Sequence, residues 1–434
     1  MEVVSSIFTI IWAIIRTWWW FLLPILLWKP LLFMWRWWRM DQCTKGIENI
    51  LLELKMPREV DRPFKAMEQV FAGFWMFYDP ADWYEKWWEG KYQVTLSLEV
   101  ASIGGEIHFY IRAPRGYRNL VESSIYSQYP EVEISEVEDY TKNVPQDIPN
   151  KEWDMWGTDY ETIKKDIYPI KTYSKFFEET AAAKEEKRID PLAALLEGLA
   201  KTGPGEQVWV QLRIKPITVA ENDYEKRAKE EVDKLANRFD SSKLKQASMI
   251  KEAADVVVLG QLPGEQGEEK EKSWMPPEMK LTPGEREIVA GIESKIAKTM
   301  FECVMRFVIL GEKEKWNKGN LKNVLGFFAN FNTGNLNALK PWAPSITKIH
   351  KHERFFINIF LYDQLLYLKK RKLFRRYISR LNYLFPKSGK SIIFNIEELA
   401  SLFHFIGRAA VPAPMIQRVE SKKVEAPSAL PTEQ

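Results

Sequence analysis

The chain of 434 residues contains little cysteine and little histidine. Its two cysteines, Cys43 and Cys303, lie far apart, so neither a disulfide framework nor a cysteine-based zinc site is expected. Among the four histidines, His350 and His352 form the one close pair, which we interpret as two loop histidines rather than metal ligands. The sequence therefore predicts neither a bound metal nor a cofactor.

A strong net charge is also missing. The chain has 62 Lys and Arg against 59 Asp and Glu, a formal net charge of +3. This near balance excludes a protein that coats nucleic acid along its whole length, but it leaves local basic patches open. Hydrophobic residues make up 46% of the chain, which predicts a globular protein with a real core and room for two or three domains.

A complete phosphate-binding loop is missing as well. Gly389, Lys390 and Ser391 match the end of the pattern G-x-x-x-x-G-K-[ST], but Leu384 stands where the first glycine belongs. A basic helix is expected before the tripeptide and a strand, SIIF, after it, whereas the motif needs a strand before and a helix after. We interpret it as a polar turn and do not expect an enzyme. An ATPase using Lys390 and Ser391 is the least favoured alternative.

Tryptophan, in contrast, is abundant. Between residues 7 and 28 only Arg16 is charged, a run long enough to cross a hydrocarbon core, which takes ~20 helical residues. Indole rings favour membrane–water interfaces. The pattern predicts a transmembrane anchor over residues 1–42, with a re-entrant hairpin as the alternative because Pro24 and Pro30 would kink a helix. The proposed anchor residues are Trp12, Trp18, Trp19, Trp20, Trp28, Trp35, Trp37 and Trp38.

The charges beside this run predict its orientation. No Lys or Arg precedes Arg16, whereas Lys29, Arg36 and Arg39 follow. Because basic residues favour the cytoplasmic side, we expect a protein of the cell membrane with the bulk of the chain in the cytoplasm. The small number of cysteines agrees with a reducing compartment.

The pattern after the anchor predicts a first α+β module over residues 43–220. It contains a helix beginning near Pro63, a hairpin over 94–112 that turns at Gly104-Gly105, a helix to Pro130, and a strand with an acidic outer face over 131–140. This order resembles the ferredoxin-like arrangement. A helix from Asp190-Pro191 and a strand over 207–217 follow.

A charged helix and linker, residues 221–281, lead to a second α+β module over 282–406. Thr282 and Glu285 form a predicted capping box, and Asn395 and Glu398 form another. Residues 407–434 are rich in proline and polar side chains, which predicts an extended tail. The predicted fold class is therefore α+β, with an N-terminal transmembrane segment followed by two ferredoxin-like α/β sandwich modules.

The strongest local charge lies on the predicted helix near residue 370. It could contact nucleic-acid phosphates or anionic lipid, but a solvated helix face is the plainer interpretation. Arg112, Arg115 and Arg118 are likewise interpreted as a solvated helix start. The proposed phosphate or lipid contacts are Lys369, Lys370, Arg371, Lys372, Arg375 and Arg376.

Three stretches carry a resemblance to a known family: GGEIHFYIRAPRGYRNLVESSIYSQYPEVEISEVEDY (104–140), GEQVWVQLRIKPI (205–217) and FNIEELASLFHF (394–405). They resemble uncharacterised bacterial proteins in which a membrane-anchored α+β region precedes an ATPase of the type IV secretion and conjugation kind. The tail VPAPMIQRVESKKVEAPSALP is similar to the stretch that leads into that motor. The ATP-binding residues of the family have no counterpart in this sequence.

The resemblance implies a membrane-anchored, non-catalytic scaffold or accessory subunit of a type IV secretion- or conjugation-like translocation assembly. Its expected partners are membrane lipid and a motor ATPase on a separate chain. The alternative is a module that binds nucleic acid or anionic lipid through the basic run over residues 369–380.

Overall fold

The computed structural model describes residues 2–56, 63–177, 190–236, 281–315, 317, 319–348, 357–380 and 391–406. Its helices are α1 (Glu2–Gly46), α2 (Pro63–Phe74), α3 (Arg118–Tyr126), α4 (Tyr173–Phe177), α5 (Pro191–Ala200), α6 (Tyr224–Leu235), α8 (Pro283–Ile296), α9 (Asn320–Ala329), α10 (Ile357–Ser379) and α11 (Ile396–Leu402). Its strands are β1 (Asn49–Lys55), β2 (Leu96–Ile103), β3 (Glu106–Pro114), β4 (Glu133–Val137), β5 (Trp153–Thr162), β6 (Glu206–Pro216), β7 (Met300–Glu312), β8 (Leu339–Pro341) and β9 (Ile392–Asn395).

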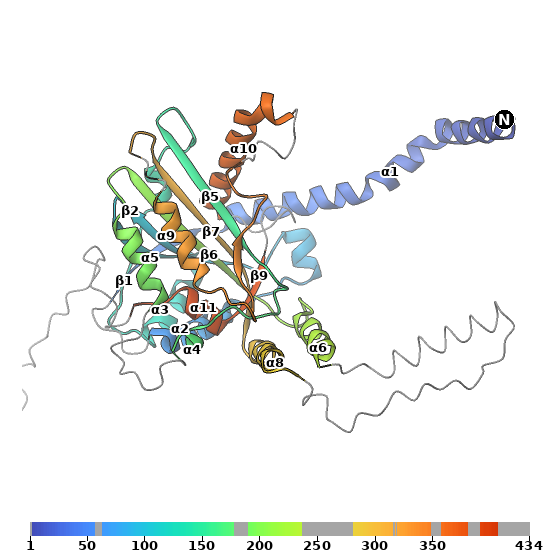
Figure 1. The fold of residues 1–434 in the computed structure, drawn as a ribbon. Coiled ribbons are helices and arrows are strands. Elements are labelled where there is room, and N and C mark those ends of the chain that lie inside the picture. The colour runs from blue at the N-terminus through green and yellow to red at the C-terminus, as the bar shows by residue number, and fades with distance from the viewer. Residues whose placement is uncertain are drawn as a thin grey trace, which may run out of the picture.

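These strands form one antiparallel sheet in the order β4-β1-β3-β2-β6-β7-β5-β8, with β9 added to β7 (Figure 1). The central strand β6 pairs with β2 on one side, where Leu98 lies opposite Leu212. On its other side β6 pairs with β7 over its whole length, from Glu206 opposite Gly311 to Pro216 opposite Phe301. The fold class is therefore α+β, as predicted.

The division into two ferredoxin-like modules is wrong, because strands from both predicted modules belong to the same sheet. The reason lies in β6, whose residues are buried on both faces apart from Lys215. A strand with two paired edges and two covered faces belongs to the middle of a large sheet and cannot close a small sandwich. Three strands that had not been predicted extend this sheet, β1 on one side and β5 and the short β8 on the other.

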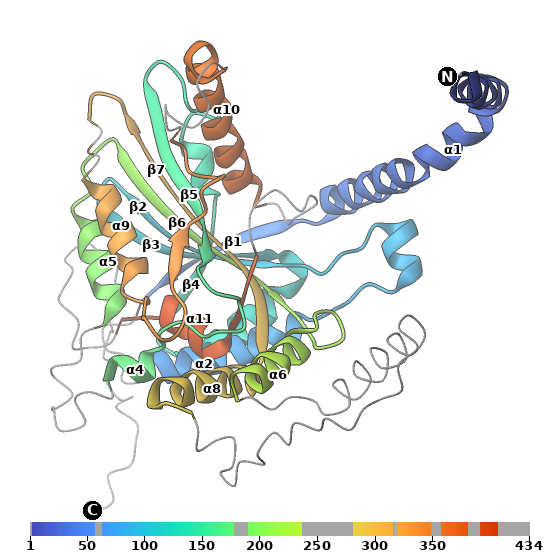
Figure 2. The ribbon, with the colours of Figure 1, turned by 45° about the vertical axis from the view of Figure 1, so that its right-hand side comes forward.

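One face of the sheet carries the main apolar core. Helices α2, α5, α9 and α11 cover this face (Figure 2), and α3 packs against α2. Side chains such as Leu98, Val210 and Phe307 alternate inward from successive strands. The opposite face packs against α10, whose Phe374 and Tyr377 contact a second cluster around Trp209. Trp209 is fully buried, with its ring 5.3 Å from that of Tyr377.

Several local predictions are confirmed. The hairpin of β2 and β3 turns at Gly104 and Gly105, whose φ values of 60° and 99° suit residues without a side chain. Both capping boxes are present: Thr282 caps α8 with Glu285, and Asn395 caps α11 with Glu398. Sequence-local chemistry therefore determines where these elements begin and turn.

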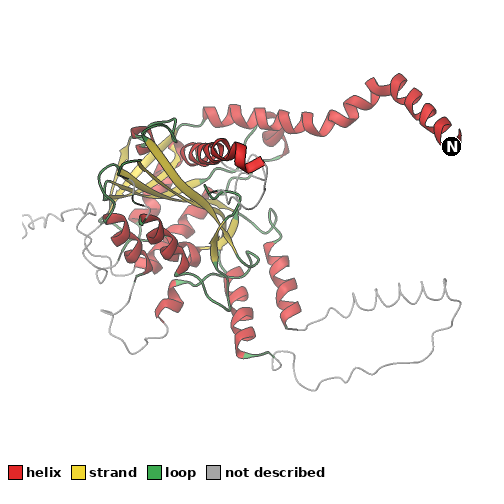
Figure 3. Ribbon diagram, turned by 45° about the horizontal axis from the view of Figure 1, so that its top comes forward, coloured by secondary structure: helices red, strands yellow, loops and turns green. Residues whose placement is uncertain are grey.

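The predicted transmembrane segment is wrong. Helix α1 extends over 45 residues and leads away from the sheet (Figure 3). Among the residues that the structure describes, however, no helix combines the length and the apolar character that crossing a bilayer requires. The indoles that fill α1 each carry a polar N–H, and Arg16 and Lys29 interrupt its apolar side chains.

Several sequence-based hypotheses fall outside the described residues. These are the histidine pair, Gly389, Lys390, the tail over 407–434, and most of the linker before residue 281. Ser391 is described and directly precedes β9, which pairs with β7. A phosphate-binding loop would continue into a helix at this point, so the local geometry differs from that motif.

Candidate functional site

A group of exposed aromatic and apolar side chains covers the C-terminal half of α1 and the segment that packs against it. Trp28 is 58% exposed, Met34 64% and Trp83 69%. We call this group the aromatic surface. Its members are Trp28, Leu31, Met34, Trp35, Trp37 and Trp38 of α1, together with Trp83, Tyr84 and Trp88.

Most of the α1 residues in the aromatic surface are proposed anchor tryptophans, namely Trp28, Trp35, Trp37 and Trp38. Trp12 and Trp20 are also exposed, at 59% and 60%, farther along α1. The side chains of Trp18 and Trp19 lie outside the described part of the chain. So much exposed indole is unusual for a protein surface and marks a contact region.

The segment that carries Trp83 and Trp88 is attached to α1 by specific contacts. It contains a short π-helix, Glu85–Glu89. The Trp35 indole donates a hydrogen bond to the Trp87 carbonyl at 2.9 Å, and the rings of Trp35 and Trp88 meet edge to face at 5.8 Å. The Arg36 guanidinium lies 5.3 Å from the centre of the Trp87 ring. These contacts unite two sequence regions in one surface.

Gly90 makes this close approach feasible. Its φ of 74° lies in the left-handed region, and a Cβ at this position would lie 2.2 Å from the Arg39 carbonyl oxygen. We expect Gly90→Ala to detach the π-helix from α1, because a left-handed alanine alone costs about 1–2 kcal/mol. Hydrogen exchange of the peptide over 85–91 should accelerate by about tenfold or more.

Gly116→Ala is the matched control, because a Cβ there would meet nothing within 4 Å. Its exchange over residues 85–91 should equal that of the unmodified protein. Unchanged protection in Gly90→Ala would contradict the assigned packing.

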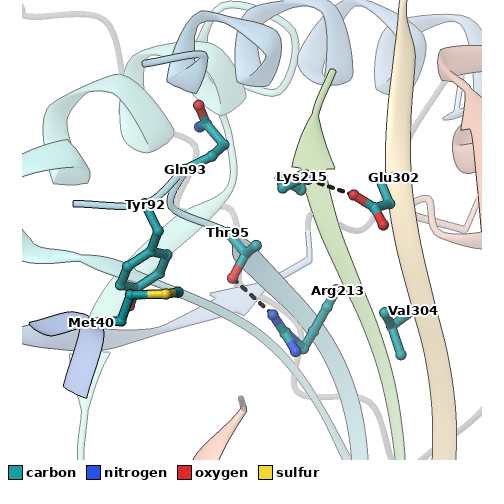
Figure 4. Close-up of a pocket in the computed structure, with 8 residues that line it drawn as sticks. All are labelled: Met40, Tyr92, Gln93, Thr95, Arg213, Lys215, Glu302 and Val304. Carbon is teal, nitrogen blue, oxygen red and sulfur yellow. Dashed lines mark hydrogen bonds and ion pairs between the residues drawn. The ribbon is translucent and has the colours of Figure 1, made fainter. Parts of the chain in front are cut away.

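A cavity of about 200 Å³ lies where the end of α1 meets the sheet, on the same face as α10 (Figure 4). Arg213 of β6 is 2% exposed and donates to the Thr95 hydroxyl at 3.1 Å. Lys215 and Glu302 form an ion pair at 2.5 Å across the other wall. A smaller hollow of about 70 Å³ adjoins it and shares Met40, Tyr92 and Thr95 as lining residues.

Beside the smaller hollow, a buried ionic network lies between the sheet and α10. Arg380 binds the Glu99 carboxylate through two hydrogen bonds of 2.7 and 2.8 Å, and it also binds Asp139 at 2.6 Å. The Tyr140 hydroxyl donates to Glu99 at 2.8 Å, and Gln211 donates at 2.9 Å. Burial raises the pKa of Glu99, but the charge and hydrogen bonds of Arg380 outweigh this and leave the pKa below its ordinary value.

The basic residues of α10 fall into two groups. Some make ion pairs or hydrogen bonds within the protein, and others are exposed to solvent. Lys370 pairs with Asp154 at 2.6 Å, and Arg371 donates to the Gln146 and Ile148 carbonyls. Arg376 is buried and pairs with Asp159, which also contacts Arg306. Lys372 and Arg375 are exposed, and Lys369 is partly buried. A binding role for the run would therefore fall mainly on Lys372 and Arg375.

The three arginines after the hairpin also separate. Arg115 pairs with Glu48 and Glu136, and Arg118 pairs with Glu122 and Glu136, so both stand on the surface as predicted. Arg112 differs from these two arginines, because its side chain lines the smaller hollow together with Arg380. No sequence pattern indicates this separation, since a strand end and a helix start both carry exposed arginines.

Comparison with family models places the chain in a family. Residues 83–343, more than half of the chain, match the model described as Domain of unknown function (DUF8128). The chain belongs to the DUF8128 family. The DUF8128 region begins at Trp83 and includes β2 to β8, hence Arg112 and Arg213, whereas α1 and α10 lie outside it. A comparison with curated proteins found no match. Neither result bears on the resemblance to secretion ATPases, which stays a prediction.

Proposed function

We propose that the protein is a non-catalytic module that holds its α+β sheet against the surface of an anionic lipid bilayer. The aromatic surface carries this proposal. Tyrosine and tryptophan combine a large apolar ring with a polar tip, so they are stable where apolar lipid meets water. The proposed contact lies on the bilayer surface and does not require a helix that crosses it.

The charge of α1 supports an anionic partner. Between Glu2 and Asp41 the chain has no acidic residue, whereas Arg16, Lys29, Arg36 and Arg39 are basic. Each basic side chain near an anionic surface contributes about 1 kcal/mol to binding. Apolar contact and charge attraction therefore favour the same occupant.

Vesicle flotation of the full-length chain tests this proposal. We expect the protein to float with phosphatidylglycerol vesicles and to bind phosphatidylcholine vesicles more weakly, especially at low salt. Trp28→Ser with Trp83→Ser should lower the partition coefficient by about tenfold or more, because burying one large apolar side chain contributes about 1.5–3 kcal/mol.

Ile163→Ser with Val219→Ser is the control, because these apolar residues are 57% and 44% exposed but lie outside the aromatic surface. This control should float like the unmodified protein. Equal loss in both double variants, or no loss in either, would exclude the aromatic surface as the lipid contact.

The sequence resemblance supports a finer proposal, that the module serves as an accessory subunit of a secretion- or conjugation-like assembly with a separate motor ATPase. We place it on the cytoplasmic side of the cell membrane, where the free thiols of Cys43 and Cys303 would stay reduced. Recovery of a motor ATPase with the tagged full-length chain would test this assignment. Binding through Lys372 and Arg375 of α10 remains the alternative.

A further inference from the structure

The smaller hollow contains an arginine whose charge is not balanced by direct contact. Arg112 lies on β3, opposite Leu51 of β1 and Ser97 of β2, and its side chain lines the hollow. Among the residues that the structure describes, the side chain of Arg112 makes neither a hydrogen bond nor an ion pair, although its backbone belongs to the sheet. Arginine has five N–H donors, so this guanidinium can receive a ligand.

Burial and a neighbouring positive charge both disfavour the charged form of Arg112. Burial lowers the pKa of Arg112, and the nearby charge of Arg380 lowers it further, although Glu99 and Asp139 act in the opposite direction. Both carboxylates already bind Arg380 directly, Glu99 through two hydrogen bonds. A partly buried arginine without its own counterion would be stabilised by an anion that entered the hollow.

Other donors surround the same space. The Thr95 hydroxyl accepts its hydrogen bond from Arg213, so its own hydrogen is available for an acceptor in the cavity. The Tyr92 hydroxyl lies 3.2 Å from the Thr44 hydroxyl, and both residues line the hollow. The volume of about 70 Å³ suits a small group and continues into the larger cavity through Tyr92 and Thr95.

We propose that this hollow binds a phosphate group, with Arg112 as the principal ligand and Thr95 and Tyr92 as hydroxyl contacts. Arginine binds phosphate and carboxylate oxygens through the same planar fork. Several hydroxyls beside the fork favour phosphate, because its additional oxygens give each hydroxyl an acceptor. The group could belong to free phosphate or to a phospholipid headgroup, since the hollow adjoins the end of α1.

Calorimetric titration of the full-length chain in phosphate-free buffer tests the site. Inorganic phosphate is the first probe, and sodium acetate at the same ionic strength is the second. We expect phosphate to bind and acetate to bind at least about tenfold more weakly. Arg112→Gln should weaken phosphate binding by about 10- to 100-fold, because a hydrogen bond to a charged group is lost.

Arg115→Gln is the matched control, since it removes the same charge three residues away from an exposed, ion-paired side chain. It should leave phosphate affinity unchanged. Arg112→Gln should also fold normally and unfold at the same or a higher temperature, because it removes an uncompensated charge. Phosphate binding that survives Arg112→Gln, or equal binding of acetate, would overturn the proposal, as would absence of binding at millimolar phosphate.

A second arm identifies the source of the phosphate group. Flotation of Arg112→Gln with phosphatidylglycerol vesicles should fall below that of Arg115→Gln if the ligand is a lipid headgroup, and should equal it if the ligand is free phosphate. Because titration with inorganic phosphate needs no vesicle, it tests this site independently of the lipid-surface function. Failure of the aromatic surface to bind vesicles would therefore leave the phosphate site standing.

Discussion

Replacing Arg380 by alanine should lower the free energy of unfolding by about 3–5 kcal/mol, the range for removing one partner of a buried ion pair. The Arg380 side chain is 1% exposed and that of Glu99 is 0%. Without Arg380, Glu99 would remain buried with only neutral donors, namely Ser97, Tyr140 and Gln211. The desolvation cost of that carboxylate would then be uncompensated.

Urea denaturation of the full-length chain measures this effect. Arg375→Ala is the matched control, because Arg375 stands exposed on α10, which ends directly before Arg380, and its substitution should change stability by less than about 0.5 kcal/mol. Adding Glu99→Gln to Arg380→Ala should recover part of the loss by removing the buried charge. A loss in Arg380→Ala no larger than that in the control would contradict the network.

The effect should also depend on pH in a defined direction. Because the folded pKa of Glu99 lies below its ordinary value of 4.5, the pair stabilises the protein above that value and loses this contribution as the pH falls through the folded pKa. Asp139 has a lowered pKa for a related reason and acts in the same direction. The difference between the unmodified protein and Arg380→Ala should therefore shrink in acid below about pH 4.5.

Lys295→Met is expected to have a similarly large effect, again about 3–5 kcal/mol. The Lys295 ammonium lies 3.0 Å from Glu398 and donates to the Asp166 and Ile393 carbonyls, with 1% of its side chain exposed. Glu398 in turn accepts from the backbone N–H of Ile170. One ion pair thus holds α8, β9, α11 and a loop together.

The control for Lys295→Met is Lys201→Met, which breaks an ion pair with Glu197 whose side chains are 69% and 59% exposed. That pair should contribute only about 0–1 kcal/mol. Both variants can be compared by urea denaturation. Equal stability of the two would show that the buried pair contributes no more than a surface pair does.

The destabilisation by Lys295→Met should shrink in acid, as that by Arg380→Ala does, although the folded pKa of Glu398 is shifted upward and that of Glu99 downward. Burial raises the pKa of Glu398 even though the charge of Lys295 lowers it, and removing Lys295 should raise the pKa further. An acid with a raised folded pKa favours folding below its ordinary value of 4.5 and loses this contribution as the pH rises. Lys295→Met should therefore be less destabilised at acidic pH than at neutral pH.

The sequence predicted well those features that depend on neighbouring residues. The Gly104-Gly105 turn and the two capping boxes follow from backbone geometry and a few side chains, so their patterns were sufficient. The union of both halves in one sheet could not be predicted in this way. It depends on pairing between β6 and β7, which lie about 90 residues apart in the chain.

Polar residues on the strands made the second face of the sheet look exposed to water, although α10 covers it. Glu99, Gln211 and Arg306 alternate with apolar side chains, a pattern typical of a strand with one face in water. In the structure all three are fully or almost fully buried under α10. Gln211 donates to Glu99, Glu99 also binds Arg380, and Arg306 donates to the Arg376 carbonyl. Arg112 escaped prediction for the same reason, since only tertiary contacts distinguish it from Arg115.

The central place of β6 has a consequence for the growing chain at the ribosome. When residue 216 has emerged, β6 can pair with β2, but its other edge has no partner until β7 is complete at residue 312. Throughout that interval an eleven-residue strand presents open backbone groups and apolar side chains that can join a neighbouring nascent chain. Productive synthesis of this protein therefore depends on how quickly the later strand arrives or on a chaperone that shields the waiting edge.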